Sequence, residues 1–181
     1  MTLTKKIFIG IVTVIILFTV FVFWLFFEIV NENQEDEKFN NIEISDNLNF
    51  EKPIEFLTNR QIDSLTKIKV NDEKIVVIGD GYNGYDFYMW HKPTEKGKLY
   101  IKAFELTKNI QLSELELNTR TENEISKLGE NYKLYTGNSL IYEGTFAHYY
   151  PVRFELWFKP KNKGIEKKLT EKKYVIDGWD R

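Results

Sequence analysis

Residues 151–160, "PVRFELWFKP", decide the fold class of this chain. Apolar side chains occupy every second position of the segment, at Val152, Phe154, Leu156 and Phe158. This period of two is typical of a β-strand that buries one face, because successive side chains of a strand point to opposite sides. The same alternation places Trp157 on the face that points away from the core. The segment therefore predicts a long, half-buried strand.

The residues that follow predict a partner for this strand. Residues 159–167, "KPKNKGIEK", have the composition of a hairpin turn, and residues 167–179, "KKLTEKKYVIDGW", read as the returning strand. The side chains expected on one face of that strand are those of Thr170, Lys172, Tyr174 and Ile176. We expect a C-terminal antiparallel hairpin.

Four shorter runs upstream also have the composition of strands. They are rich in Val, Ile, Tyr, Phe and Trp and are separated by Gly, Pro, Asn and Asp. The runs are residues 73–80, 85–91, 97–106 and 138–147. Strands at this spacing indicate a mainly β domain, so we expect residues 42–181 to form an immunoglobulin-like or related antiparallel β-sandwich.

Only two segments of this domain have a helical pattern. Residues 58–68 carry apolar side chains at every third position. Residues 121–129 begin with a capping box from Thr121 to Glu124, and a glycine ends the segment. We expect one or two short helices that decorate the sheets.

Residues 7–27 form an uncharged apolar segment, long enough to cross the roughly 30 Å of bilayer hydrocarbon as a helix. The segment is longer than the core of a signal peptide and ends in the bulky residues 24–27, so we expect an uncleaved anchor in the lipid bilayer. Lys5 and Lys6 precede it and acidic residues follow it. The positive-inside rule then places residues 1–6 in the cytoplasm and everything after the anchor across the membrane.

Residues 28–41 are polar and acidic without apolar periodicity, so we expect a flexible stalk. Two of the 25 Lys and Arg residues precede the anchor, which leaves 23 against all 27 acidic residues. This balance argues against nucleic-acid binding, which needs a strongly positive surface. The chain has no Cys, which excludes disulfides and thiolate metal sites, and we expect neither a metal nor a cofactor. The richness in Lys, Asn and Ile favours a bacterial inner-membrane protein with a periplasmic or extracellular domain.

The pattern Gly-x-Gly-x-x-Gly at residues 79–84 matches the start of a dinucleotide-binding loop. Such a site needs a helix to begin at the glycines, whereas residues 85–91 have the composition of another strand. We therefore interpret the glycines as a hairpin turn. A calcium site with ligands at Asp80, Asn83 and Asp86 is an alternative, although the spacing is not that of an EF-hand.

Aromatic side chains are the candidates for a binding surface. Rings that face outward can anchor a protein partner or stack on a sugar, but they can equally lie beneath a second sheet or a loop. The candidate binding residues are Tyr82, Tyr85, Tyr88, Trp90, Tyr149, Tyr150 and Trp157.

The sequence contains few of the residues and motifs that form known catalytic sites. The chain lacks Gly-x-Ser-x-Gly and His-Glu-x-x-His, and its two histidines, His91 and His148, are far apart in sequence. A site built on a histidine or on a pair of carboxylates stays open as an alternative. We assign no catalytic residue.

Three stretches, residues 97–113, 142–158 and the final "IDGWDR" at 176–181, resemble a group of uncharacterised bacterial proteins. Proteins of that group have one N-terminal membrane helix and a small β-rich domain that ends in Gly-Trp-x-Arg. The resemblance implies the same architecture for most of the chain after the stalk, and it implies no activity.

The anchor, the β-rich domain and its aromatic side chains together predict a membrane-tethered module without catalytic activity. We expect it to bind another protein of the cell envelope or to take part in envelope assembly. Two alternatives follow from the same features. One is a membrane-tethered hydrolase that uses carboxylates, and the other is a glycan-binding domain.

Overall fold

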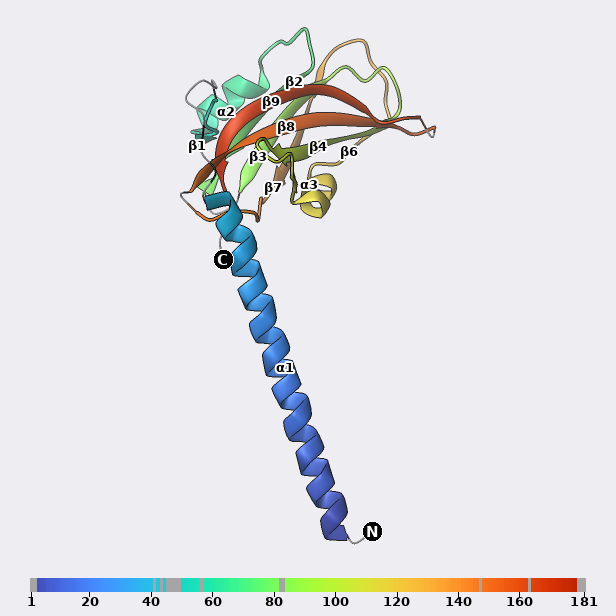
Figure 1. Cartoon of the computed structure of the whole chain (residues 1–181). Coiled ribbons are helices and arrows are strands. Elements are labelled where there is room, and N and C mark those ends of the chain that lie inside the picture. Colours follow the sequence, from blue (N-terminus) through green and yellow to red (C-terminus); the bar gives the residue numbers. More distant parts are fainter. Residues whose placement is uncertain are drawn as a thin grey trace.

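The computed structural model describes residues 3–40, 42, 44, 50–55, 57–81, 84–146, 148–162 and 164–178. A long N-terminal helix leads into a mainly β domain, and the two C-terminal strands are its longest (Figure 1).

The first sheet has four strands in the order β1-β2-β3-β7. Their bounds are Ile54–Glu55 for β1, Lys74–Gly79 for β2, Tyr85–His91 for β3 and Lys133–Ser139 for β7. β1 runs parallel to β2, and the other neighbours are antiparallel. The predicted hairpin between β2 and β3 is confirmed. Gly81 and Gly84 have positive φ angles of 51° and 88° in its turn, and β3 follows the glycines where a dinucleotide site would need a helix.

The second sheet is built on β4 and its antiparallel neighbour β8, with β9 beyond β8. The bounds are Gly97–Glu105 for β4, Gln111–Leu112 for β5, Asn123–Ile125 for β6, Tyr149–Pro160 for β8 and Lys167–Asp177 for β9. The short strands β5 and β6 both pair with β4. The predicted C-terminal hairpin is confirmed as β8 and β9.

The two sheets pack face to face through one hydrophobic core. As the alternation predicts, β8 buries its apolar face, where Val152, Phe154 and Leu156 are fully buried. The Phe154 ring lies edge-on to Phe87 of the first sheet, with 5.4 Å between ring centroids. The expected mainly β class with antiparallel sheets is confirmed, whereas this strand order does not establish an immunoglobulin-like topology.

The predicted helix near residue 60 is confirmed as α2, Asn59–Thr66. Its first turn is closed by a capping interaction in which the Thr58 N–H donates to Gln61 Oε1 at 2.9 Å. The apolar side of α2 covers the outer face of the first sheet, where Tyr88 and Trp90 form a second buried cluster.

The second helix expected from the sequence, over residues 121–129, is wrong. The helix lies earlier, as α3 at Glu114–Arg120, and the chain then enters β6. The Thr121 hydroxyl donates to the Leu117 carbonyl at 2.5 Å and accepts the Ile101 N–H of β4 at 2.9 Å. Thr121 therefore closes α3 rather than opening a new helix. Pairing of β6 with β4 outweighs the local helical signal.

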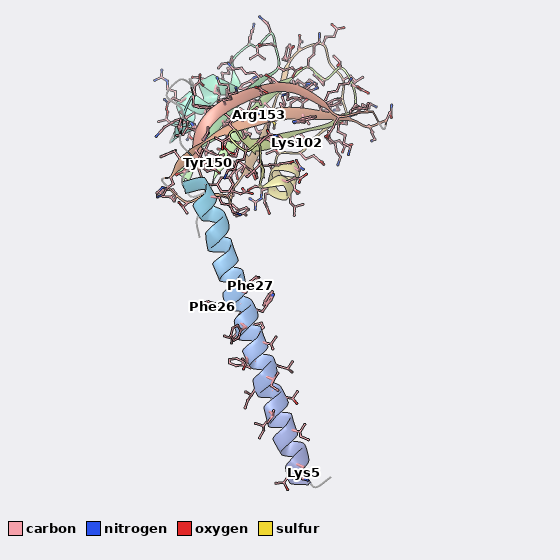
Figure 2. The ribbon with its side chains drawn as sticks, viewed as in Figure 1. Lys5, Phe26, Phe27, Lys102, Tyr150 and Arg153 are labelled. Atoms are coloured by element: carbon pink, nitrogen blue, oxygen red, sulfur yellow. The ribbon has the colours of Figure 1, made fainter. Side chains whose placement is uncertain are left out.

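The N-terminal helix α1 spans Leu3–Asn40. Its stretch Ile9–Phe27 is long and apolar enough to cross a membrane, and none of it is buried against the domain. Figure 2 shows bulky side chains around this part of the helix, up to Phe26 and Phe27.

The acidic segment after the apolar stretch is not the flexible stalk expected from its composition, because α1 continues through it to Asn40. Phe39, only 6% exposed, docks into the domain core and packs on the Tyr150 ring at 5.2 Å between centroids. This contact fixes the C-terminal end of the helix. The Glu, Gln and Lys residues of the segment also have good helix propensity. With a rise of about 1.5 Å per residue, the segment separates the domain from the apolar stretch by roughly 20 Å.

Candidate binding cleft

The structure buries most of the aromatic side chains that the sequence offers as binding candidates. Four of the seven are core residues: Tyr85, Tyr88, Trp90 and Tyr150. Tyr85 and Tyr150 lie between the two sheets, whereas Tyr88 and Trp90 lie beneath α2. Tyr85, Tyr88 and Trp90 are therefore not displayed as an exposed surface around the β2–β3 turn. Tyr82 lies outside the described residues.

The buried tyrosines satisfy their hydroxyl groups inside the domain. The Tyr85 hydroxyl donates to the carbonyl and carboxylate oxygens of Asp177, both at 2.9 Å. The Tyr150 hydroxyl donates to the Glu143 carbonyl at 2.6 Å. Burial raises the pKa of both hydroxyls, and nearby carboxylates reinforce the shift. Both groups therefore act as neutral structural hydrogen-bond donors.

Two candidates, Tyr149 and Trp157, are half-buried. Lys52 lies over the Tyr149 ring, with Nζ 3.8 Å from the centroid. Trp157 points away from the core, as predicted, but Lys102 Nζ lies 4.2 Å from its ring centroid. The exposed parts of both rings are thus already in contact with lysine side chains.

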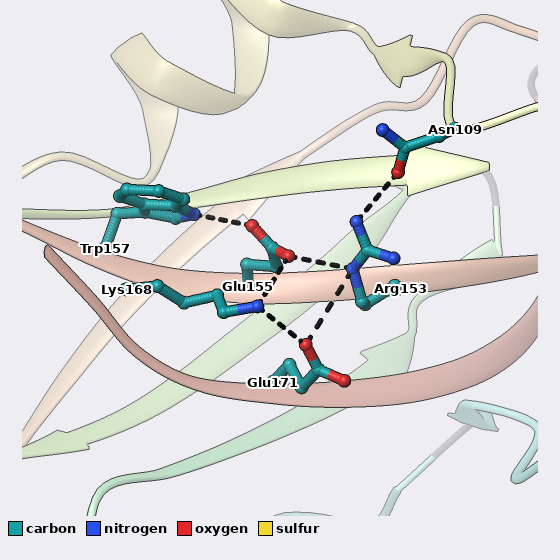
Figure 3. Close-up of polar contacts among 6 residues, drawn as sticks. All are labelled: Asn109, Arg153, Glu155, Trp157, Lys168 and Glu171. Atoms are coloured by element: carbon teal, nitrogen blue, oxygen red, sulfur yellow. Dashed lines mark hydrogen bonds and ion pairs between the residues drawn. The ribbon is translucent and has the colours of Figure 1, made fainter. Parts of the chain in front are cut away.

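A charged network surrounds Trp157 on the outer face of β8 and β9 (Figure 3). Its centre is Glu155, which is 3% exposed and accepts hydrogen bonds from three donors. The donors are Arg153 Nε at 2.8 Å, Trp157 Nε1 at 2.8 Å and Lys168 Nζ at 3.2 Å. Lys168 also donates to Glu171 at 2.9 Å, and Arg153 donates to the side-chain oxygen Oδ1 of Asn109 at 2.9 Å. Each of the six residues drawn makes at least one hydrogen bond or ion pair within this network, which indicates a structural role.

A cleft of about 520 Å³ opens beside this network, between α3 and the outer face of β4. Tyr100 and Lys102 of β4 line it, and Glu166 reaches it from the turn between β8 and β9. Lys102 Nζ bonds Glu166 at 2.7 Å, and the Tyr100 hydroxyl donates to the same carboxylate. These two hydrogen bonds lower the pKa of Glu166, while burial and the carboxylate raise that of Tyr100. The polar side chains of Tyr100 and Lys102 on the β4 wall of the cleft are thus both bonded to Glu166.

The rim of the cleft carries two further ion pairs. Lys98 of β4 bonds Glu122 at 2.7 Å, and Lys161 lies 3.7 Å from Glu124 of β6. These side chains are exposed to solvent, so each pair contributes little to stability. Their effect on the cleft is to neutralise most of the charge at its edge.

Three polar groups of the cleft lack a hydrogen-bond partner among the described residues. Asn118 Oδ1 on α3 is buried and accepts no hydrogen bond. The side chains of Glu114, one turn earlier on the same helix, and of Lys159 on β8 make no ion pair or side-chain hydrogen bond with the described part of the chain, although the Lys159 charge helps to lower the pKa of Glu166. An acceptor that is buried without a partner costs about 1–3 kcal/mol, so Asn118 is a locally unfavourable position in the wall of the cleft.

α3 holds Asn118 and Glu114 in place because both ends of the helix are fixed. At the start, the Ser113 N–H and hydroxyl both donate to the Glu143 carboxylate at 2.7 Å. At the end, Thr121 lies against Gly137 of β7, where an added Cβ would stand 2.7 Å from Thr121 Cα. Leu117 is fully buried between them. The sequence signals α3 only by a serine before "ELELNTR" and by one leucine that faces the core. These signals are too few, and the helix is too short, for α3 to be predicted from the sequence.

The remaining sequence candidates do not assemble into a second site. His91 is buried, stacks on Phe158 and places Nδ1 3.0 Å from a Glu73 carboxylate oxygen, whereas His148 is exposed. Asp86 accepts a hydrogen bond from Asn138 at 2.8 Å, and Asn83 lies outside the described residues. Within the described ranges, no group of three His, Cys, Asp or Glu side chains is arranged to hold a metal ion.

Comparison with protein-family models, curated proteins and solved structures finds no match to this chain.

Proposed function

We propose that this chain is a single-pass membrane protein whose β-rich domain binds a second protein of the cell envelope through the cleft between α3 and β4. The single observation that carries the proposal is the cleft itself. It combines a volume of about 520 Å³ with charged side chains on both walls, among them Glu114 and Lys159, which make no ion pair or side-chain hydrogen bond with the described residues. Pockets that take a ligand typically combine such a volume with a few polar groups that converge on it.

The N-terminal helix supports the tethering part of the proposal. Lys5 and Lys6 on one side of the anchor and acidic residues on the other favour a cytoplasmic N-terminus and a domain across the membrane. A helix that continues to Asn40 and docks through Phe39 would display the domain at a set height above the bilayer. The proposal needs a rigid two-sheet scaffold and does not depend on an immunoglobulin-like strand order.

The carboxyl groups of the cleft favour binding over the hydrolase alternative. A general acid needs a raised pKa, whereas the hydrogen bonds from Lys102 and Tyr100 lower the pKa of Glu166. Sugar stacking is also less favourable here, because Lys102 covers the half-buried Trp157 ring.

The chain has no cysteine, so single-cysteine variants test both parts of the proposal with one reagent. Thr4→Cys marks the N-terminus, Leu115→Cys (77% exposed in the native leucine) lies beside the cleft, and Ile68→Cys is an exposed control beyond α2. With an impermeant maleimide on intact cells, we expect labelling at positions 68 and 115 and none at position 4. We expect position 115 to react several-fold more slowly in native membranes than in purified protein, because a partner covers it.

Two results would count against this account. Labelling of Thr4→Cys in intact cells would reverse the orientation. If position 115 is protected no more strongly than position 68, no partner selectively covers the cleft side of the domain.

A further inference from the structure

One residue, Glu143, lies between the docked end of α1 and the start of α3. Its backbone carbonyl accepts the Tyr150 hydroxyl at 2.6 Å, and the Tyr150 ring packs on Phe39 of α1. Its carboxylate accepts the N–H and the hydroxyl of Ser113, both at 2.7 Å. Glu143 therefore touches the docking site of the long helix with one group and the residue before α3 with another.

The docking site of α1 is tightly packed. Phe39 is 6% exposed, and Tyr150 is fully buried. An added Cβ at Gly144 would stand 2.7 Å from the Tyr150 ring and 3.2 Å from Phe39 Cβ, so the loop that carries Glu143 lies directly against both rings. A displacement of Phe39 would therefore disturb Tyr150 and the backbone of this loop.

Ser113 is the part of α3 that depends on Glu143. Its φ of 37° and ψ of 46° lie in the left-handed region, which is unfavourable for a residue other than glycine and persists only where surrounding contacts hold it. The contacts are the two bonds to Glu143 and a third in which Ser113 Oγ accepts the Tyr142 N–H at 2.9 Å. The Ser113 carbonyl in turn accepts the Leu117 N–H at 2.9 Å, a bond that closes the first turn of α3.

We propose that docking of α1 holds the first turn of α3 in place through Glu143, so that one wall of the cleft responds to the position of the N-terminal helix. α1 is unbroken from Leu3 to Asn40, so a tilt of its apolar stretch would be carried along the helix to Phe39. Release of Phe39 then loosens Ser113, and by reciprocity a loosened Ser113 weakens the docking of α1. This inference goes beyond the proposed function, because the coupling needs no partner in the cleft.

Amide hydrogen exchange of the full chain in detergent micelles, followed residue by residue, tests the coupling. The reporter is the Leu117 N–H of α3, and the reference is the Ile62 N–H of α2, which bonds Thr58 on the outer face of the other sheet. With Phe39→Ala we expect about tenfold faster exchange at Leu117, within the range of ordinary allosteric coupling, and unchanged exchange at Ile62.

Two further variants keep this comparison interpretable. Phe39→Leu retains an apolar contact and should give a smaller increase at Leu117; it carries the same comparison if Phe39→Ala does not fold. Leu128→Ala truncates a side chain that is 53% exposed and should change exchange at neither amide.

Glu143→Ala locates the coupling, because it removes the carboxylate that holds Ser113 and keeps the backbone carbonyl that Tyr150 bonds. We expect faster exchange at Leu117 in this variant. Adding Phe39→Ala should give no further increase, because the connection is already broken.

Three outcomes would overturn the inference. The first is unchanged exchange at Leu117 in both Phe39 variants. The second is an equal increase at Leu117 and Ile62, which would mean that Phe39 stabilises the whole domain and not α3 in particular. The third is a double variant in which the effects of Phe39→Ala and Glu143→Ala multiply, since the two sites would then act independently.

Discussion

Phe154→Ala is expected to lower the free energy of unfolding by about 3–5 kcal/mol, the largest effect of any single change considered for this domain. Phe154 is fully buried at the centre of β8. Its ring contacts Phe87 across the two sheets at 5.4 Å and Tyr174 of β9 at 6.0 Å between centroids. Removing the ring deletes apolar contacts on both sides and leaves a cavity that the strands cannot close, because both sheets are fixed by backbone pairing.

The measurement is chemical denaturation of the purified full chain in detergent micelles. Leu128→Ala is the matched control, because Leu128 is 53% exposed and its truncation should change stability by less than about 0.5 kcal/mol. If Phe154→Ala were as mild as Leu128→Ala, the two sheets would not share a core through β8.

Glu155→Ala is the second large effect, with an expected loss of about 2–3 kcal/mol. Glu155 is 3% exposed and accepts hydrogen bonds from Arg153, Trp157 and Lys168. Its removal leaves two cations and an indole N–H with fewer partners. The expected loss lies below the full cost of an isolated buried charge, because the Lys168 side chain is 42% exposed and keeps its bond to Glu171.

Glu130→Ala supplies the comparison for Glu155→Ala, because it truncates an exposed glutamate outside the network. We compare the thermal unfolding of the two variants in the same micelles. A larger shift in the unfolding temperature for Glu155→Ala is expected if the network around Glu155 stabilises the fold. A shift for Glu155→Ala no larger than that for Glu130→Ala would show that the network contributes nothing to the folded state.

The C-terminal hairpin could be predicted because its information is local. The alternation in β8 specifies which side chains are buried, and the structure follows it at Val152, Phe154 and Leu156. A one-residue slip would turn all of these side chains to the solvent, so burial fixes the register strongly. The β2–β3 turn could also be predicted from the sequence, because glycines mark it, and Gly81 and Gly84 adopt positive φ angles there.

The position of α3 could not be predicted, because the interactions that decide it are long-range. Thr121 looks like the start of a helix in sequence, yet its hydroxyl bonds Leu117 and the Ile101 N–H of β4. Gly137, far along the chain, makes the close approach possible. Local capping signals are worth about 1 kcal/mol and yield to such contacts.

For the same reason, most residues of the candidate cleft could not be predicted from the sequence. The aromatic content of the sequence favours Tyr85, Tyr88, Trp90 and Tyr150 as binding residues, but an aromatic ring is equally suited to a core, and the structure buries all four. The groups that define the cleft, Asn118, Glu114 and Lys159, are ordinary polar residues in sequence. Their significance comes only from the segments that the fold brings together, since α3 and β8 meet at the cleft.

In the acidic segment after the apolar stretch, tertiary contacts outweigh the structure that composition alone predicts. Its charge predicts a flexible stalk, whereas the helix persists to Asn40 because Phe39 is captured by the core beside Tyr150. A docked helical spacer restricts where the cleft can meet a partner. In the proposed membrane-tethered arrangement, residues 28–40 hold the domain roughly 20 Å from the bilayer hydrocarbon.

Site-specific photo-crosslinking in intact cells tests the central claim most directly. A photoreactive amino acid replaces Leu115, the exposed neighbour of the cleft-lining Glu114, and Ile68 beyond α2 serves as the control position on the full chain. Our account predicts one reproducible crosslinked protein from position 115, absent from position 68 and reduced when Glu114→Gln is introduced. No adduct from position 115, or the same adducts from both positions, would contradict it.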